Sequence, residues 1–145
     1  MKKLLLALAL LGITAPAFAG STPTCTDAPT TLSAVINDTY VDLSWVAPGS
    51  CTPTKYAIEV FAQYGLVGGE GCDGGTTLTL SYTSPKGDPA VTTFSFALAD
   101  LTPPEGYTSC AVPEVKVKAL TTQPPGPNKS QNNPFSDAVP ISSGV

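Results

Sequence analysis

The chain has 145 residues and a formal net charge of −4; its 7 basic residues are all lysine, and it has no histidine. An acidic chain without arginine lacks the groups that best neutralise phosphates, so nucleic acid and anionic membranes are not expected partners. The absence of histidine excludes Ser/His/Asp and Cys/His nucleophilic sites, and it removes the usual zinc ligands.

Residues 1–19 have the pattern of a secretory signal peptide. A basic start, "MKK", precedes an apolar run that ends at Ile13, and "AFA" before Gly20 matches an A-x-A cleavage site. The apolar run is too short and wrongly flanked for stable membrane insertion, with a retained N-terminal anchor as the alternative. We expect an exported chain of residues 20–145, extracellular or periplasmic, whose net charge becomes −6 once the two N-terminal lysines are lost.

Four cysteines lie in this mature part, at Cys25, Cys51, Cys72 and Cys110. An even number of cysteines in an exported chain indicates two disulfides. A metal cluster is the alternative, but the chain has neither a C-x-x-C pair nor a histidine to build one. We therefore expect no metal and no cofactor.

Seven short segments show the alternation of apolar and polar residues that is typical of half-buried strands. In chain order they are Leu32–Ile36, Val41–Trp45, Tyr56–Val60, Leu78–Tyr82, Phe94–Leu98, Val115–Ala119 and the short "SDAVPIS". Turn-rich sequences separate them, including "APGSCTP" and the glycine-rich "GLVGGEGCDGG". The pattern predicts a single all-β domain, an immunoglobulin-like sandwich of two packed antiparallel sheets.

Several of these segments resemble the strands of a fibronectin type III domain. "VDLSWVAP" resembles the second strand of that family, "KYAIEV" the third, "VKVKAL" the sixth and "FSDAVPIS" the seventh. "FALADLTPPEGY" resembles the family segment in which a tyrosine follows a leucine by six residues. The resemblance covers most of residues 20–145 and implies a structural core that contains Trp45, Tyr56, Leu101 and Tyr107.

The chain departs from the family at two insertions, residues 65–89 and 108–113. The second insertion separates Tyr107 from the sixth strand. Either that strand carries a bulged extension, or Tyr107 is not a true corner tyrosine of the family.

The resemblance also implies a disulfide pairing. In the resembled fold, Cys25 and Cys51 lie at one pole of the sandwich, whereas Cys72 and Cys110 lie at the opposite pole. Because a bridge needs α-carbons within about 7 Å, the implied pairs are Cys25–Cys51 and Cys72–Cys110.

The loop Thr121–Pro134 is the candidate binding element. It is long and rich in proline, which lowers the entropy lost on binding, and in asparagine, which offers hydrogen bonds. A plain exposed connector is the alternative interpretation. The candidate binding residues are Pro124, Pro125, Asn128, Asn132, Asn133 and Phe135.

The remaining motifs give weak signals of chemistry. The acidic residues fall at turns or at outward strand positions, where a solvated surface role is expected. Glu70 and Asp73 could help to hold calcium, but they lack the regular oxygen spacing of a calcium loop.

The sequence therefore predicts a non-enzymatic, secreted interaction or structural module that contacts protein or cell-surface polymer. The alternative is a carbohydrate-binding module that uses the loop aromatics Tyr64, Tyr107 and Phe135. The expected partner is an unidentified protein or an extracellular polysaccharide, and self-assembly is a further alternative.

Overall fold

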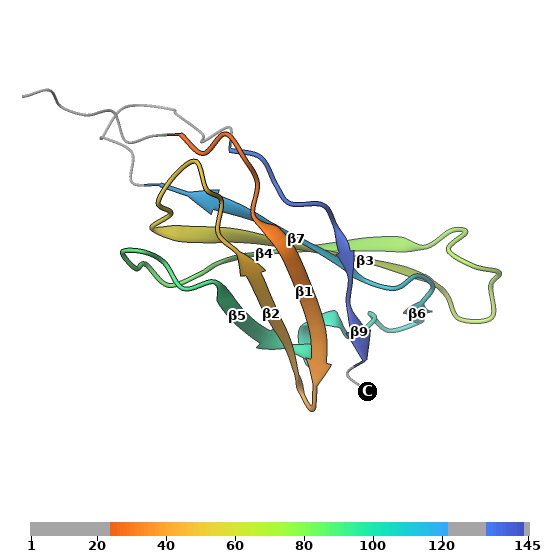
Figure 1. Ribbon diagram of the computed structural model, residues 1–145. Helices are drawn as coiled ribbons and strands as arrows, with labels where there is room; N and C mark the ends of the chain where they lie inside the picture. The colour runs from red at the N-terminus through yellow and green to blue at the C-terminus, as the bar shows by residue number, and fades with distance from the viewer. Residues whose placement is uncertain (1–23, 122–132, 144–145) are drawn as a thin grey trace, which may run out of the picture.

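Strands form where apolar and polar side chains alternate, and they assemble into two layers (Figure 1). The computed structural model describes residues 24–121 and 133–143. Within these residues two sheets pack face to face and enclose the apolar side chains. The predicted all-β sandwich is confirmed.

Sheet A contains four strands in the order β5-β2-β1-β9. These strands are β1 (Thr30–Asn37), β2 (Tyr40–Val46), β5 (Thr93–Ala97) and β9 (Ser142–Ser143). β2 pairs antiparallel with both β1 and β5, whereas β9 runs parallel to β1. The first and last described strands are therefore neighbours that point in the same direction.

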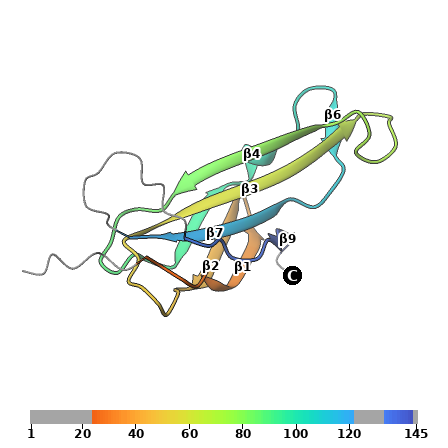
Figure 2. The same ribbon diagram turned by 90° about the horizontal axis from the view of Figure 1, so that it is seen from above.

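Sheet B contains five strands, with β4-β3-β7-β8 in order and β6 paired to β3. They are β3 (Lys55–Leu66), β4 (Thr76–Thr83), β6 (Tyr107–Ser109), β7 (Glu114–Leu120) and β8 (Val139–Pro140). All of these pairs are antiparallel. In Figure 2, β4 forms one border of this sheet and β3 lies between β4 and β7.

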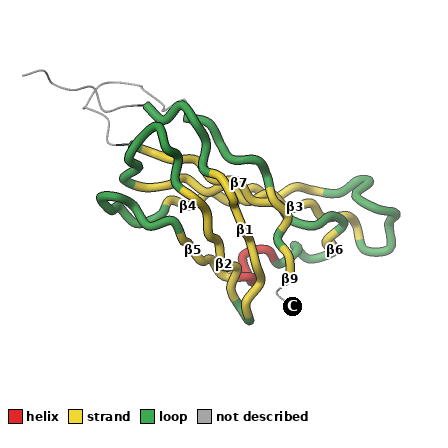
Figure 3. Tube along the Cα trace, viewed as in Figure 1, coloured by secondary structure: helices red, strands yellow, loops and turns green. Residues whose placement is uncertain are grey.

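The structure differs from the sequence prediction at two strand ends. Leu98 does not continue β5 but begins a 3-10 helix, η1 (Leu98–Leu101), drawn red in Figure 3. The single predicted last strand is divided into β8 and β9, which pair with different sheets. Pro140 cannot donate a backbone hydrogen bond, which limits how far β8 can pair with β7.

A third difference concerns β3, which does not stop where the glycine-rich sequence begins. The strand continues through Gly65 to Leu66, and β6 pairs with this extension. A side chain at Gly65 would collide with the carbonyl of Gly71, so glycine here permits close packing of the loop against the strand. Gly65 therefore allows the backbone of the loop at Gly71 to lie close to β3, and it does not end the strand.

The core is built from the inward-facing positions of both sheets. Trp45 of β2 and Tyr56 of β3 contact each other across the sandwich, edge to face, with ring centroids 4.9 Å apart. Leu101 is also buried, whereas Tyr107 is half-buried and packs against the edge of the core. The other large side chains that are fully buried include Val41, Ile58, Val60, Tyr64, Val115 and Val117.

Two disulfides close opposite ends of the sandwich. Cys25–Cys51 joins the start of the described chain to the loop after β2, with α-carbons 5.1 Å apart. Cys72–Cys110 joins the loop after β3 to the segment after β6, with α-carbons 5.3 Å apart. This is the pairing that the resemblance implied, and such bonds indicate an oxidising environment.

Hydrogen bonds reinforce the first bridge. The carboxylate of Asp27 accepts from the backbone N–H of Gly49 (2.8 Å) and of Ser50 (3.1 Å). The hydroxyl oxygen of Ser50 in turn accepts from the backbone N–H of Thr26 and of Asp27. Asp27 therefore anchors the loop after β2 instead of serving only as a solvated charge.

Within residues 24–121 and 133–143, no helix has the length and apolar character needed to cross a membrane.

Candidate functional site

The candidate loop is only partly described, and its described part packs against β7. Pro124, Pro125, Asn128 and Asn132 lie outside the described residues. Asn133 is buried, and its amide donates a hydrogen bond to the carbonyl of Ala119 (2.8 Å). Asn133 therefore attaches this end of the loop to β7.

Phe135 also lies against β7. Its ring is half-buried beneath two ammonium groups, with Lys116 Nζ 4.4 Å and Lys118 Nζ 4.7 Å from the centroid. These distances are typical of cation–π contacts. The ring is therefore covered on this face by the protein's own lysines.

Tyr64 is not a loop residue, which corrects its role as a candidate for sugar stacking. It lies in β3 with 1% of its surface exposed, and its hydroxyl donates a hydrogen bond to the carbonyl of Leu101 (2.9 Å). Burial raises the pKa of this phenol. Tyr64 fastens the end of β3 to η1 and is not available to a ligand.

Glu70 and Asp73 both lie exposed in the loop between β3 and β4. Among the residues that the structure describes, no three Cys, Asp or Glu side chains gather closely enough to hold a metal ion.

The outer face of sheet B carries an exposed aromatic ring, Phe61, which is not among the predicted binding residues. Alternation along β3 turns Tyr56, Ile58 and Val60 inward, so Glu59 and Phe61 point away from the core. Phe61 is 41% exposed. Its place in the alternation of β3 was the signal in the sequence that could have revealed it.

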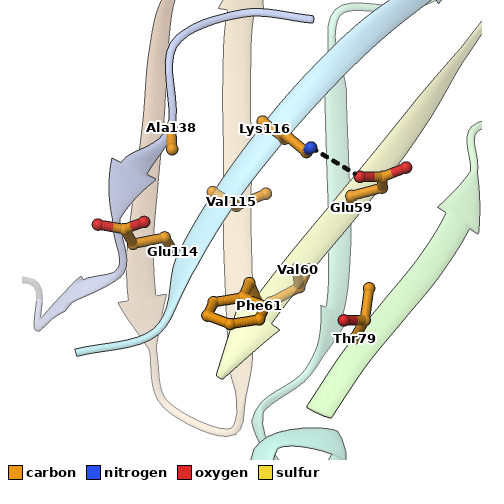
Figure 4. Close-up of a pocket in the computed structure, with 8 residues that line it drawn as sticks. All are labelled: Glu59, Val60, Phe61, Thr79, Glu114, Val115, Lys116 and Ala138. Atoms are coloured by element: carbon orange, nitrogen blue, oxygen red, sulfur yellow. Dashed lines mark ion pairs between the residues drawn. The ribbon is translucent and has the colours of Figure 1, made fainter. Parts of the chain in front are cut away.

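Phe61 lines a shallow groove of about 300 Å³, which we name the Phe61 groove (Figure 4). Across the sheet, Phe61 is opposite Thr79 of β4 on one side and Glu114 of β7 on the other. The groove thus places an apolar ring between a hydroxyl group and a carboxylate. Its lining residues are Glu59, Val60, Phe61, Thr79, Glu114, Val115, Lys116 and Ala138.

One wall of the Phe61 groove is ordered by an ion pair. Lys116 Nζ lies 2.9 Å from a carboxylate oxygen of Glu59, as the dashed line in Figure 4 shows. Both side chains are well exposed, so the pair contributes about 1 kcal/mol or less to stability. Because Lys116 also contacts Phe135, the ion pair and the cation–π contact together fix the position of its charge.

The groove has the character of a contact surface. An exposed ring with polar neighbours can bury apolar area against a partner, while the surrounding hydroxyl, carboxylate and ammonium groups can orient that partner. The other strongly exposed aromatic of the described strands, Tyr40 (55%), begins β2 in sheet A.

Neither the protein-family models nor the curated proteins that were compared with the chain gave a match.

Proposed function

We propose that the protein is an exported, non-enzymatic module of the fibronectin type III kind that contacts a protein or a cell-surface polymer through the outer face of sheet B. The observation that carries this proposal is the exposure of Phe61 in a groove on the outer face of sheet B, between Thr79 of β4 and Glu114 of β7. Binding energy at interfaces concentrates in such aromatic anchors.

Three features support the family and the location in this proposal. "KYAIEV" and "VKVKAL" lie in β3 and β7, and these strands are antiparallel neighbours, as the third and sixth strands of the resembled fold are. The two disulfides fit an extracellular or periplasmic compartment. The signal-like residues 1–19 would direct the chain there.

The test compares binding by the wild-type chain, Phe61→Ala and a matched control, Tyr40→Ala. The control also removes an exposed ring, but from sheet A. The probes are a panel of immobilised polysaccharides and the purified surface proteins of the producing cell. We expect Phe61→Ala to weaken binding to one of these probes by about tenfold or more, the effect of losing a central aromatic anchor, and Tyr40→Ala to leave it unchanged.

The two classes of partner are distinguished by which probe loses binding. Loss on a polysaccharide would identify the module as carbohydrate-binding, and loss on a protein would identify a protein ligand. Equal binding by all three chains to every probe that the wild type recognises would refute the role of the Phe61 groove.

A further inference from the structure

The border strand of sheet B, β4, is long and has an open edge. No other described strand pairs with its outer side, since β4 ends the order β4-β3-β7-β8. It spans eight residues, whereas the other border strands are β5 with five residues and β8 and β9 with two each. Proteins usually protect such an edge with charge, proline or shortness.

The sequence of β4, "TTLTLSYT", contains none of those protecting residues. It has no lysine, arginine, aspartate, glutamate or proline, although the chain as a whole carries a net negative charge. Two copies could therefore approach along β4 without bringing like charges together.

The alternation of hydrogen-bonded pairs between β3 and β4 shows which backbone groups of β4 have no partner in β3. The N–H of Ser84 donates to the carbonyl of Tyr56 (2.9 Å), so this pair is of the hydrogen-bonded kind. Antiparallel pairs alternate between hydrogen-bonded and non-hydrogen-bonded positions. The backbone groups that point away from β3 therefore belong to Thr77, Thr79, Ser81 and Thr83.

We infer that a second copy of this chain binds here, with β4 antiparallel to β4 in a twofold dimer that joins the two B sheets. The strand is complementary to itself in the register that sets Leu80 opposite Leu80 of the second copy. Thr77 then faces Thr83 and Thr79 faces Ser81, so all of the open positions pair and exchange about eight hydrogen bonds.

The side chains match in the same register. On the outer face, hydroxyl-bearing residues face one another, which favours cross-strand contact. On the inner face, Leu78 meets Tyr82 and Leu80 meets its own copy. These inner side chains are only half-buried in the single chain, so pairing would cover apolar area that is still exposed.

The twofold axis of this dimer is perpendicular to the sheet, so both Phe61 grooves lie on the same side. Three strand spacings and a two-residue offset separate the two rings by about 16 Å. The dimer does not depend on what the groove binds.

The test uses the chain of residues 20–145 and measures its average mass by sedimentation equilibrium at concentrations up to the millimolar range. We expect the average mass to rise toward twice that of one chain. Two double variants test the register. Thr79→Lys with Ser81→Lys sets like charges opposite each other and should remain monomeric. Thr79→Glu with Ser81→Lys sets opposite charges together and should still dimerise.

Both variants place two charged side chains on the exposed face of β4, so we expect them to perturb the fold of the monomer equally. Circular dichroism verifies that both variants are folded. A wild-type chain that stays monomeric at millimolar concentration overturns the inference. A Thr79→Lys, Ser81→Lys variant that still dimerises shows that another surface is used. Equal loss of dimer in both variants rules out the register.

Discussion

At the scale of single residues, Tyr64 determines how one end of the sandwich closes. Its ring fills the core, and its hydroxyl satisfies the carbonyl of Leu101 on η1. The resemblance left open whether Tyr107 is a corner tyrosine; in the structure Tyr107 begins β6 and is half-buried. Alternation along β3 would have identified Tyr64 as an inward residue, but the following Gly65 signals a loop and conceals that pattern.

Tyr64→Phe should lower the free energy of unfolding by about 1–2 kcal/mol, because it leaves a buried carbonyl without its donor while it keeps the ring. Urea denaturation measures the change. The matched control is Tyr40→Phe, which removes the same hydroxyl from an exposed ring and should change stability by less than about 0.5 kcal/mol. Equal effects of the two substitutions would contradict the assigned role of Tyr64.

Tyr82 is held in its protonated form by its surroundings. Burial, the hydrogen bond to Asp100 (2.8 Å) and the charge of that carboxylate raise the pKa of Tyr82 to about 12. Because this pKa is raised above its ordinary value of 10.0, the associated stability is complete below pH 10 and is lost as the pH rises through about 12.

Asp100→Asn should therefore lower the pKa of Tyr82, since it removes the charge, while burial still keeps the value above that of a free phenol. Phenolate absorbance during an alkaline titration measures this, with Tyr82→Phe identifying the contribution of this residue. As the control, Glu105→Gln removes an exposed carboxylate that follows Asp100 in the chain and should not move the curve. An unchanged titration in Asp100→Asn would show that Asp100 does not influence the phenol.

At the scale of elements, the sequence predicted the strands that alternate and missed the one that does not. Each of the main alternating segments lies largely within a strand of the sandwich. β6 was missed because "YTS" contains too few apolar residues to show a period, and its pairing depends on the distant end of β3. The Phe61 groove was missed for a similar reason, since it combines residues from several strands that only the sheet brings together.

The Cys72–Cys110 bridge should locally stabilise β6 and the end of β3 with which β6 pairs. It closes a separation of 38 residues and Cys25–Cys51 one of 26, so the chain-entropy account gives about 3–4 kcal/mol for each. Replacing both cysteines of either pair by serine should lower the free energy of unfolding by such an amount, as chemical denaturation would show.

Hydrogen exchange distinguishes the two bridges. Cys72→Ser with Cys110→Ser should expose the amides of β6 and of the end of β3, and it should leave β1 and β2 protected. Cys25→Ser with Cys51→Ser serves as the control and should affect the opposite pole. Loss of protection throughout the sandwich in the first variant would mean that the extension is not a separable element.

At the scale of the whole molecule, the described chain enters at one pole and leaves at the other. The described chain begins before the start of β1, and β9 pairs in parallel with the far end of β1 (Figure 1). Tension applied to the two ends would therefore load the β1–β9 contact in shear, so that its hydrogen bonds resist together instead of opening one after another.

The bridges also limit how far a stretched molecule can lengthen. Their loops do not overlap, and at about 3.5 Å per extended residue they withhold about 90 Å and 130 Å of chain. Single-molecule stretching should show that reduction adds about 220 Å to the final extension, and an equal extension in both states would refute the pairing. While both bridges are intact, the molecule can give up only the part of its length that lies outside the two loops, so its reach under tension depends on the redox state of its surroundings.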